Sequence, residues 1–472
     1  WSCIPALFMS SRRVTVKSKE SGLTKMLSSL SLLLIQALTT AVVATNPGIY
    51  FYDWDHLQTC TPLTYSLPRT EQEIIDAILT ARSRNETLKV IGTGHSFSGV
   101  QLTEGNMVSL DHYNKVLTRT DLSDGNTLVE VQAGIRLRDL NDALDKMGLS
   151  MLNLGATAAQ SVAGATATGT HGTGTKLGSL STQISAMRVI DSSGHVHVVS
   201  EHDEDTDLFE AARVGIGAVG AISTMTFKVA PLFKLRKRNI AYELPTLLKE
   251  LPSLLQQYER LQWYFTPYTT KATLVLREET TEPVSPPPTA DDPGGCWGSQ
   301  PEAQYDCTDV SYKALTDSLA GYESRTIYTE MEMFIPVEHT EAAILDFIAY
   351  MEHVKSQHNP MVELFTGVRY VKADTILLSP MNKRDSSVIS FIVLGNQNHT
   401  GSPKEFELYA SGLEEICEVK YNGRPHWGKV NYVTNSYLKK EYGVALDTFN
   451  MMRNEMDPER MFSNKYLDER LE

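Results

Sequence analysis

Two glycine-rich stretches set the strongest constraint on how this 472-residue chain folds. The first, VIGTGHSFSGV, covers residues 90–100 and continues the strand-like run Leu88–Ile91. The second, SVAGATATGTHGTGTKLGSL, covers residues 161–180, and up to Lys176 its only large side chain is that of His171. Small residues at this density let backbone N–H groups approach an anion closely. Two such turns, each beside a strand, predict a nucleotide pyrophosphate held between two loops.

Other signatures of catalytic or phosphate-binding loops fit these stretches less well. The Walker pattern is absent, and GTGHSF lacks both the third glycine and the helix signal of a dinucleotide fingerprint. Gly-His-Ser-Phe-Ser nearly spells a nucleophile elbow, but that turn needs glycine where Ser98 stands. His95 is adjacent to Ser96 in sequence and cannot serve as its triad base. A glycine-rich structural turn without a ligand stays open as the alternative.

Composition and spacing exclude two further classes of protein. Lys plus Arg total 43 and Asp plus Glu total 57, which gives a net charge of −14 and argues against a nucleic-acid partner. Cys3, Cys60 and Cys417 have no metal-ligand spacing. His195-Val196-His197 alternates behind a turn and is interpreted as a hairpin strand with exposed histidines. No metal site is therefore predicted.

The first 44 residues are predicted to be a leader outside the fold. Basic residues precede the apolar stretch Leu27–Ala44, which ends in small residues as a signal peptide does. An uncleaved membrane anchor is the alternative, because residues 27–44 approach the length that spans a bilayer. Either interpretation predicts the secretory pathway: the endoplasmic reticulum lumen, its membrane, or secretion.

Two further features agree with an oxidising lumen. Cys296 and Cys307 lie in one polar loop and are expected to be able to form a local disulfide. Asn-x-Thr sequons begin at Asn85 and Asn398, which predicts a glycoprotein.

The chain is organised as an α+β protein of at least two domains. Strands alternate with short helices over residues 62–233, a second domain covers 234–420 with a proline-rich loop insertion at 278–307, and 421–472 form a C-terminal segment that returns to the first domain. A capping-box pattern predicts a helix after Thr70. Further helices are predicted at 137–149, 247–261 and 340–354, and strands at 88–91, 108–110, 127–131, 186–190, 222–229 and 363–378.

Five motifs in fixed order carry a resemblance to a known family. They are VIGTGHSFSG, SVAGATATGTHGTG, GVRYVKADTILLSP, NGRPHWGK and DPERMF. From about residue 62 to 470 the chain resembles the aldonolactone oxidases, which include L-gulonolactone oxidase and D-arabinono-1,4-lactone oxidase among the vanillyl-alcohol-oxidase-type flavoproteins. The resemblance implies a two-subdomain, PCMH-type FAD-binding domain with an α+β cap domain. It also implies hydride transfer from an aldono-1,4-lactone to flavin N5, reduction of O2 to H2O2, and a place in ascorbate-type biosynthesis.

The same resemblance implies that FAD is attached covalently to His95. An imidazole nitrogen can attack the activated 8α carbon of the flavin ring. Positions that match the family's other FAD-contacting residues are Gly92, Thr93, Gly94, Ser96, Ser161, Thr166, Gly169, Gly172, Thr173, Ile222 and His426.

Two cations are implied to be catalytic. Arg369 and Lys429 match family positions where positive charge stabilises the reduced flavin and the loss of the substrate hydroxyl proton. Crowding by Arg369 in a buried cleft predicts that the pKa of Lys429 is lowered, which suits proton transfer. The alternative for Lys429 is an exposed surface lysine.

One position departs from the family pattern. The family strand has Glu-Val-Arg, whereas this chain has Gly367-Val368-Arg369. Glu363 lies on the same face four residues earlier, roughly 13 Å away along a strand, and cannot substitute. This departure leaves open a flavin-binding protein without turnover. An alditol oxidase and a lactone dehydrogenase with another electron acceptor stay open as well, because the small residues beside the flavin that control oxygen access are not placed by the sequence.

Overall fold

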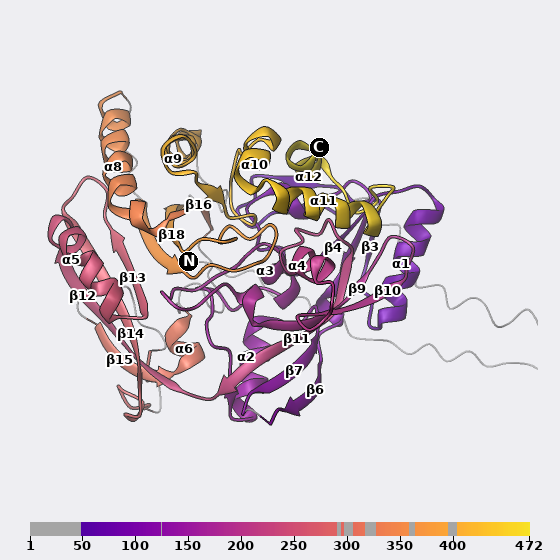
Figure 1. Cartoon of the computed structure of the whole chain (residues 1–472), viewed down its shortest axis with the longest axis horizontal. Coiled ribbons are helices and arrows are strands. Elements are labelled where there is room, and N and C mark those ends of the chain that lie inside the picture. The colour runs from indigo at the N-terminus through magenta and orange to yellow at the C-terminus, as the bar shows by residue number, and fades with distance from the viewer. Residues whose placement is uncertain are drawn as a thin grey trace, which may run out of the picture. The chain divides into compact units, whose positions relative to one another are not determined.

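A computed structural model describes residues 49–123, 125–289, 294–296, 305–316, 327–357, 364–394 and 404–472 (Figure 1). The predicted leader and the sequon at Asn398 lie outside these ranges. Asn85, the other sequon asparagine, is exposed in the turn that follows the first helix. No helix in the described part of the chain is both long and apolar enough to cross a membrane.

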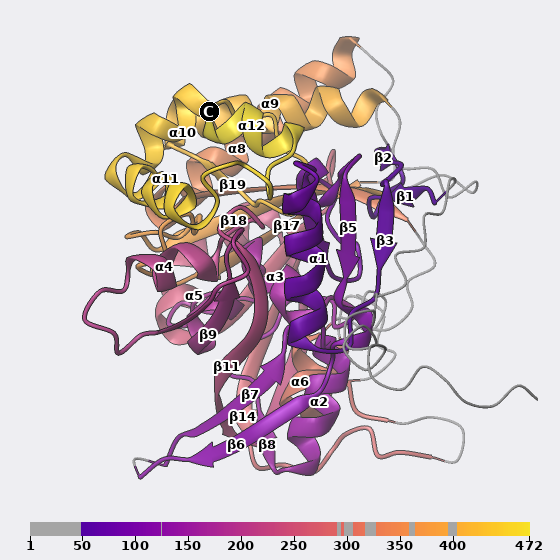
Figure 2. The ribbon, with the colours of Figure 1, turned by 90° about the vertical axis from the view of Figure 1, so that its right-hand side faces the viewer.

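The first glycine-rich stretch begins at the end of strand β4, which belongs to a small parallel sheet of order β3-β5-β4. Helix α1 packs beside this sheet through the fully buried Ile74 and Ile78 (Figure 2). Its predicted N-cap is confirmed, because the Thr70 hydroxyl accepts the Glu73 N–H at 3.2 Å. The elements are β3 (Thr64–Ser66), α1 (Glu71–Ser83), β4 (Leu88–Ile91) and β5 (Asn106–Ser109); a hairpin of β1 (Phe51–Tyr52) and β2 (Thr59–Cys60) precedes them.

An antiparallel sheet of order β10-β9-β11-β7-β6, with β8 on the end of β11, follows in sequence. The predicted helix over 137–149 ends at Lys146, because Gly148 has a φ of +72° and the chain turns there into β8. His195 is exposed as expected, while His197 is half-buried and contacts Asp191 at 2.8 Å. The strands are β6 (Val116–Asp121), β7 (Thr127–Gln132), β8 (Leu149–Ser150), β9 (Ile184–Ile190), β10 (Val196–Ser200) and β11 (Ala221–Pro231), and the helices are α2 (Leu137–Lys146), α3 (Val162–Ala167) and α4 (Asp207–Arg213).

The largest sheet has eight strands in the order β15-β12-β14-β13-β17-β18-β16-β19. Alternate residues such as Trp263, Val368 and Met333 form an apolar core with helices α5, α8 and α9 on its outer side (Figure 1). The strands are β12 (Lys234–Glu243), β13 (Arg260–Phe265), β14 (Lys271–Thr280), β15 (Tyr305–Val310), β16 (Tyr328–Pro336), β17 (Leu364–Val371), β18 (Ser386–Leu394) and β19 (Arg424–Pro425). The helices are α5 (Leu244–Gln257), α6 (Ser311–Leu315), α8 (Thr340–Gln357) and α9 (Lys404–Tyr421).

Two predicted elements in this region are shorter than expected. The helix predicted over 247–261 ends at Gln257, and the apolar run continues as β13 because its residues pair with both β14 and β17. The strand predicted over 363–378 ends at Val371. The Asp374 carboxylate then accepts the Ile376 N–H at 3.1 Å and the Ser379 hydroxyl at 2.6 Å, which closes a turn instead of extending the strand.

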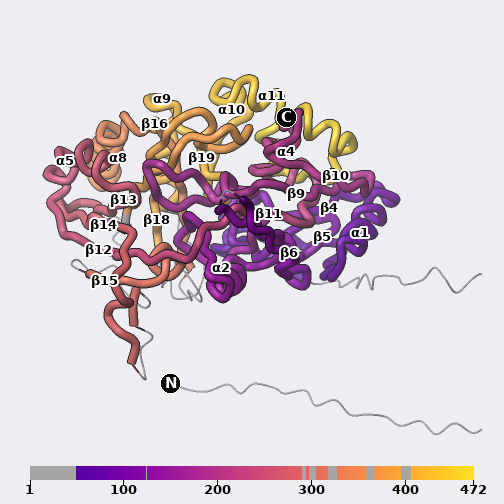
Figure 3. Tube along the Cα trace, turned by 60° about the horizontal axis from the view of Figure 1, so that its bottom comes forward, coloured from indigo at the N-terminus to yellow at the C-terminus, as the bar shows by residue number. Residues whose placement is uncertain are grey.

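The C-terminal helices return to the first half of the chain. Leu438, Phe449 and Leu467 belong to the same buried cluster as Val129 and Met225 of the antiparallel sheet. Figures 1 and 3 agree in placing α11 beside α4. These helices are α10 (Asn435–Tyr442), α11 (Val444–Met456) and α12 (Lys465–Leu471). In the loop insertion, a disulfide joins Cys296 to Cys307, as the sequence suggested.

Candidate active site

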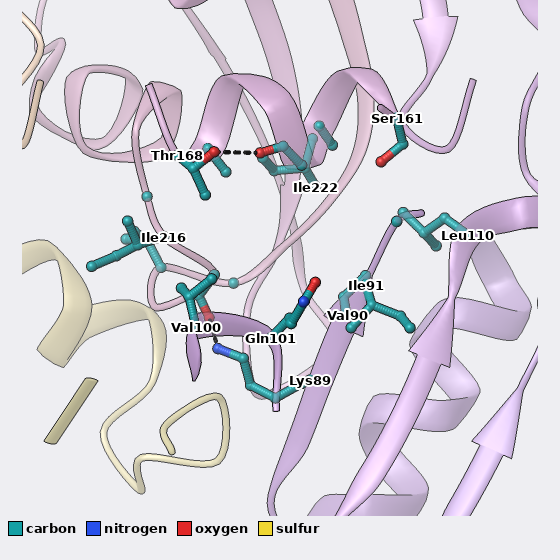
Figure 4. A pocket seen from close by; sticks show the side chains of 18 of the residues that line it. Lys89, Val90, Ile91, Val100, Gln101, Leu110, Ser161, Thr168, Ile216 and Ile222 are labelled. Atoms are coloured by element: carbon teal, nitrogen blue, oxygen red, sulfur yellow. Dashed lines mark hydrogen bonds between the residues drawn. The ribbon is translucent and has the colours of Figure 1, made fainter. Parts of the chain in front are cut away.

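The two glycine-rich stretches meet in a cavity, which we call the glycine-lined cavity (Figure 4). Ser161, Thr168 and Ile222 lie on one side of it, and Lys89 and Ile91 lie on the other. Its lining residues are Lys89, Val90, Ile91, Gly92, Ser96, Val100, Gln101, Leu110, Ser161, Ala163, Gly164, Ala167, Thr168, Val189, Ala212, Gly215, Ile216, Gly217, Val219, Gly220 and Ile222. Of the predicted cofactor residues, Gly92, Ser96, Ser161 and Ile222 are therefore brought together.

Glycine is required where the two stretches touch. A Cβ atom on Gly92 would stand 1.7 Å from the Ser161 hydroxyl oxygen, so only glycine permits this approach. On the opposite segment Gly217 and Gly220 have φ values of +66° and +109°, which other residues rarely adopt. The close approach of two loops that the sequence predicted thus has a steric cause.

The chemistry of the cavity suits a dinucleotide such as FAD. Hydroxyl groups of Ser96 and Ser161 are neutral donors for a diphosphate, the Thr168 hydroxyl donates to the Gly164 carbonyl at 3.1 Å, and Ile216 and Ile222 offer apolar surface to a ring. Among the described residues that line the cavity, Lys89 alone has a charged side chain, and its ammonium donates to the Gly217 and Phe462 carbonyls, at 3.1 Å each. Burial, followed by the charge of Arg453, lowers the pKa of Lys89 to about 7.

His95 lies in the loop that leaves the cavity, with its imidazole stacked on Trp54. The ring centroids are 4.2 Å apart and the planes differ by 20°. Burial, with the charges of Lys429 and Arg136, lowers the pKa of His95 to about 4, so the ring is neutral at physiological pH. Among the described residues no hydrogen bond to this ring is found. A neutral imidazole with a free nitrogen lone pair has the form that a nucleophile needs.

Residues 51–60 form a segment, which we call the strap, that holds Trp54 in place and contains two buried carboxyl groups. The backbone N–H of Trp54 donates to the Ser96 carbonyl at 3.0 Å. Asp53 and Asp55 flank this tryptophan and are almost wholly buried. Burial, and then the neighbouring charge of Asp55, raises the pKa of Asp53 to about 8. The sequence analysis did not single out this pair.

The second half of the site is the face of the eight-stranded sheet opposite its apolar core. Glu330 and Glu332 alternate with buried methionines on β16, so both carboxylates point to this face. Glu332 contacts Arg369 of β17 at 3.4 Å, and Glu330 is paired with Lys429. These four side chains, which we call the charged face, bring together both predicted catalytic cations.

The segment that carries Lys429 is fastened to the loop that carries His95. The Phe97 N–H donates to the Gly428 carbonyl at 2.8 Å, and the Ser98 hydroxyl donates to the Trp427 carbonyl at 2.7 Å. The Lys429 ammonium also lies 4.5 Å from the centroid of the Phe97 ring. The charged face and the predicted site of flavin attachment are therefore neighbours.

His171, Glu332 and His426 form a buried triad behind the charged face. Their ligand-type atoms lie within 4.8 Å of one another, which raises the question of a metal ion. Nδ1 of His426 accepts the Gly428 N–H at 3.0 Å, so Nε2 carries the ring proton and points it at Glu332, 3.8 Å away. Nδ1 of His171 donates to the Gly172 carbonyl at 2.8 Å, and its Nε2 lies 3.3 Å from Glu332, to which it donates when the ring carries both protons. We interpret the triad as a hydrogen-bonded network that orients Glu332.

The electrostatics of the charged face correct one prediction. Burial alone would lower the pKa of Lys429, but Glu330 and Glu332 outweigh burial and hold it above its ordinary value. The prediction of a lowered pKa was wrong because it considered Arg369 and not the two carboxylates of β16. Burial also acts to raise the pKa of Glu332, but Lys429, His171 and His426 hold it well below its usual range. Burial raises the pKa of Glu330 to about 7 despite its contact with Lys429.

Known proteins match most of this chain. Residues 62–200 match the FAD binding domain family, and residues 301–470 match the D-arabinono-1,4-lactone oxidase family. L-gulonolactone oxidase of Mus musculus is 31% identical over 444 residues, which cover 89% of this chain and 98% of the mouse protein. The chain belongs to the aldonolactone oxidase family.

A second relative and a solved structure extend this result. L-gulono-1,4-lactone dehydrogenase of Mycobacterium tuberculosis is 31% identical over 435 residues, covering 88% of this chain and 97% of that protein. A crystal structure of cholesterol oxidase from B. sterolicum superposes with a TM-score of 0.73 at 16% identity, covering 90% of this chain and 96% of that one. The resemblance and the α+β fold class are confirmed, and this aldonolactone oxidase family member is an FAD-dependent oxidoreductase.

The remaining predicted cofactor residues take different places. Thr166 is buried inside α3, where its hydroxyl donates to the Val162 carbonyl at 2.9 Å, and Thr168 lines the cavity instead. The Thr173 hydroxyl donates to the Leu261 carbonyl, and Gly172 and Thr173 line a smaller cavity that includes Arg369. Gly169 is in a left-handed turn against Pro380, Gly94 is in another beside Phe51, and Thr93 lies between Gly92 and Gly94.

The structure leaves little room at Gly367 for the glutamate that the family pattern has there. A Cβ atom there would stand 2.8 Å from the Ser390 hydroxyl oxygen and 3.1 Å from the Tyr264 ring, so neighbouring side chains fill the space. Gly367, Ser390 and Glu332 lie in one row across β17, β18 and β16. The other carboxylate considered, Glu363, lies outside the described residues.

Sequence reasoning missed four residues of the site: Trp54, His171, Glu330 and Glu332. The two glutamates had a readable signal, because TEMEMF alternates charged and apolar residues with the period of a strand. Trp54 had none, and His171 stood out only by its size within its glycine-rich stretch, since stacking on His95 and contact with Glu332 join residues far apart in sequence.

Proposed function

We propose that this protein oxidises the ring-adjacent hydroxyl of an aldono-1,4-lactone, such as L-gulono-, L-galactono- or D-arabinono-lactone, to an ascorbate-type product. The observation that carries the proposal is the charged face, with Lys429 and Arg369 half-buried beside the loop of His95. The names of relatives and the lactone oxidase family match support this substrate class. Belonging to an FAD oxidoreductase family disfavours the alternative of flavin binding without turnover.

The residues present divide the work between two regions. Bound flavin supplies the two-electron oxidant. The glycine-lined cavity would hold the dinucleotide through Ser96 and Ser161. Arg369 and Lys429 attract the oxygen of the substrate hydroxyl, and their positive charge favours the transition state in which negative charge develops.

Covalent attachment of FAD through His95 is part of the proposal. Support comes from the neutral imidazole, which makes no hydrogen bond to another residue in the described ranges, and from the stack with Trp54, which fixes the ring plane. An attached flavin cannot dissociate between turnovers and keeps one orientation toward the charged face.

The electron acceptor separates two versions of the proposal. O2 as acceptor makes the protein an oxidase, whereas another acceptor makes it a lactone dehydrogenase, as the name of the mycobacterial relative says of that protein. Steady-state peroxide release with a panel of lactones and alditols tests both versions. Peroxide with lactones supports the oxidase, and turnover only with an added dye acceptor supports the dehydrogenase. Turnover with alditols alone would contradict the substrate class.

We further propose that the protein acts in the secretory pathway, in the lumen, bound to the membrane through residues 27–44, or secreted. The Cys296–Cys307 disulfide supports an oxidising compartment. N-terminal sequencing of protein from eukaryotic cells tests the leader, and a mature chain that begins near Thr45 is expected.

A further inference from the structure

The oxidation of an alcohol must place a proton as well as a hydride, and the charged face offers few acceptors. Arg369 stays protonated, and Lys429 is held as a cation by two carboxylates. Nδ1 of His426 is occupied by the Gly428 N–H and its Nε2 carries the ring proton. Glu332 is contacted by Arg369, His171 and His426, which compete for its lone pairs.

Glu330 differs from Glu332 in its surroundings. Lys429 is the one cation within ion-pair distance of its carboxylate among the described residues, and the side chain is only 6% exposed. Both carboxylates come from the same strand, two residues apart, so they face the same space. Glu330 therefore faces the same space as Glu332, but fewer neighbouring groups compensate its negative charge.

We propose that Glu330 is the final acceptor of the substrate hydroxyl proton and that Lys429 relays it. The inference rests on the proposed lactone oxidation. Lys429 Nζ first passes one of its own protons to Glu330, and the lone pair that this exposes takes the substrate hydroxyl proton as the C–H bond breaks and its electron pair leaves as hydride to the flavin oxidant. The C=O bond forms, Glu330 becomes neutral, and Lys429 is again a cation. A lysine that is a cation before and after the step can thus stabilise negative charge and still conduct a proton.

The neighbours of Glu330 fix the pH dependence that this relay predicts. Lys429 and Arg369 lower its pKa, burial and Glu332 raise it, and the net value is about 7. Tyr328, on the same strand, has a pKa raised by burial to about 12 and does not titrate in this range. Because the relay needs ionised Glu330, the rate of flavin reduction should rise with pH through about 7 and level off above it.

The test is anaerobic stopped-flow flavin reduction by a lactone between about pH 5.5 and pH 9. Glu330→Gln keeps a hydrogen-bonding partner for Lys429 but removes the basic group, so we expect a rate about a hundredfold lower at high pH and no rise near pH 7. Glu330→Asp should restore the rise at a lower rate. Unchanged flavin absorbance and melting temperature establish that each variant is folded and loaded.

Glu332→Gln is the matched control, because it removes the other carboxylate of the strand. It should keep the rise and shift it to lower pH, since the charge of Glu332 raises the pKa of Glu330. If the rate of flavin reduction in Glu330→Gln still rises with pH near pH 7, as in the wild type, the relay is overturned. If wild-type flavin is reduced by no lactone, the proposed function fails instead, so the two failures are distinguishable.

Discussion

Among the described residues, the glycine-lined cavity contains a single charged side chain among small and apolar ones, whereas the neighbouring charged face has two buried carboxylates with a half-buried lysine and arginine. In the cavity, shape comes from backbone turns and from the absence of side chains, as at Gly92. At the charged face, function comes from side-chain charges that compensate one another. The two regions touch where Phe97 contacts both Gly428 and Lys429.

The difference indicates how each region should respond to change. The hydroxyl donors and close packing of the cavity bind the cofactor, so substitutions there should alter occupancy more than rate. Buried ion pairs are costly to break singly, because removing one partner leaves the other uncompensated. Substitutions at the charged face should therefore alter rate and pH dependence while the cofactor stays bound.

The largest expected effect is on the cofactor side. His95→Ala removes the proposed attachment point, so acid precipitation should release all of the flavin, whereas the wild-type pellet should stay yellow. His195→Ala is the matched control, because this exposed histidine lies in a turn on another sheet. Flavin that stays with the acid pellet of His95→Ala would show that attachment does not depend on this residue.

On the charged face, Lys429→Met and Arg369→Leu each remove one positive charge beside the reacting atoms. A preorganised charge of this kind contributes about 3 kcal/mol to the transition state, so anaerobic flavin reduction should slow about a hundredfold with unchanged FAD content. Lys372→Met is the control, since that lysine pairs with Asp385 at the surface. Wild-type reduction rates in both cation variants would remove the charged face from the mechanism.

A smaller effect is expected at Gly367, because neighbouring side chains pack closely against this position of the sheet. Gly367→Glu should lower the free energy of unfolding by about 1–3 kcal/mol and bring no gain in rate, because Ser390 and Tyr264 occupy the space. Gly367→Ala should cost less, since it adds only the Cβ. Denaturant unfolding measures both changes. A faster and equally stable Gly367→Glu variant would show that a carboxylate fits there after all.

The smallest effect concerns the acidic pair in the strap. A raised pKa for Asp53 means that the folded state holds a proton that the unfolded state has lost, so stability falls as pH rises from about 4 to about 8. Asp55→Asn removes the neighbouring charge and should raise the free energy of unfolding at pH 8 by about 1 kcal/mol, with little change at pH 4. Melting temperatures across this pH range check the sign. If the melting temperatures of wild type and variant change with pH in the same way, the electrostatic coupling between Asp53 and Asp55 is contradicted.

The sequence predicted the cavity better than the charged face for a physical reason. Gly92, Ser161 and the strand before them are local features, and dense glycines have few uses other than close backbone approach. The charged face is assembled across strands, and the Glu330–Lys429 pair joins residues 99 apart. The pKa of Lys429 could not be predicted correctly before β16 was known to lie beside it.

The predicted boundaries of two elements were wrong, because strand pairing or a side-chain hydrogen bond overrode the local sequence pattern. The apolar run after Gln257 continues as a strand because β14 and β17 lie on either side of it. The strand after Val371 ends because Asp374 closes a turn with its own side chain. The disulfide between Cys296 and Cys307, eleven residues apart, was predictable because the two residues share one loop.

The most direct test of the central claim is an anaerobic titration of the purified, flavin-loaded protein with an aldono-1,4-lactone, followed by visible absorbance. The account predicts that the oxidised flavin band is bleached by L-gulono-, L-galactono- or D-arabinono-lactone, and that the bleaching rate rises with pH through about 7. An absorbance that no lactone changes, in a protein whose flavin dithionite still reduces, would contradict it.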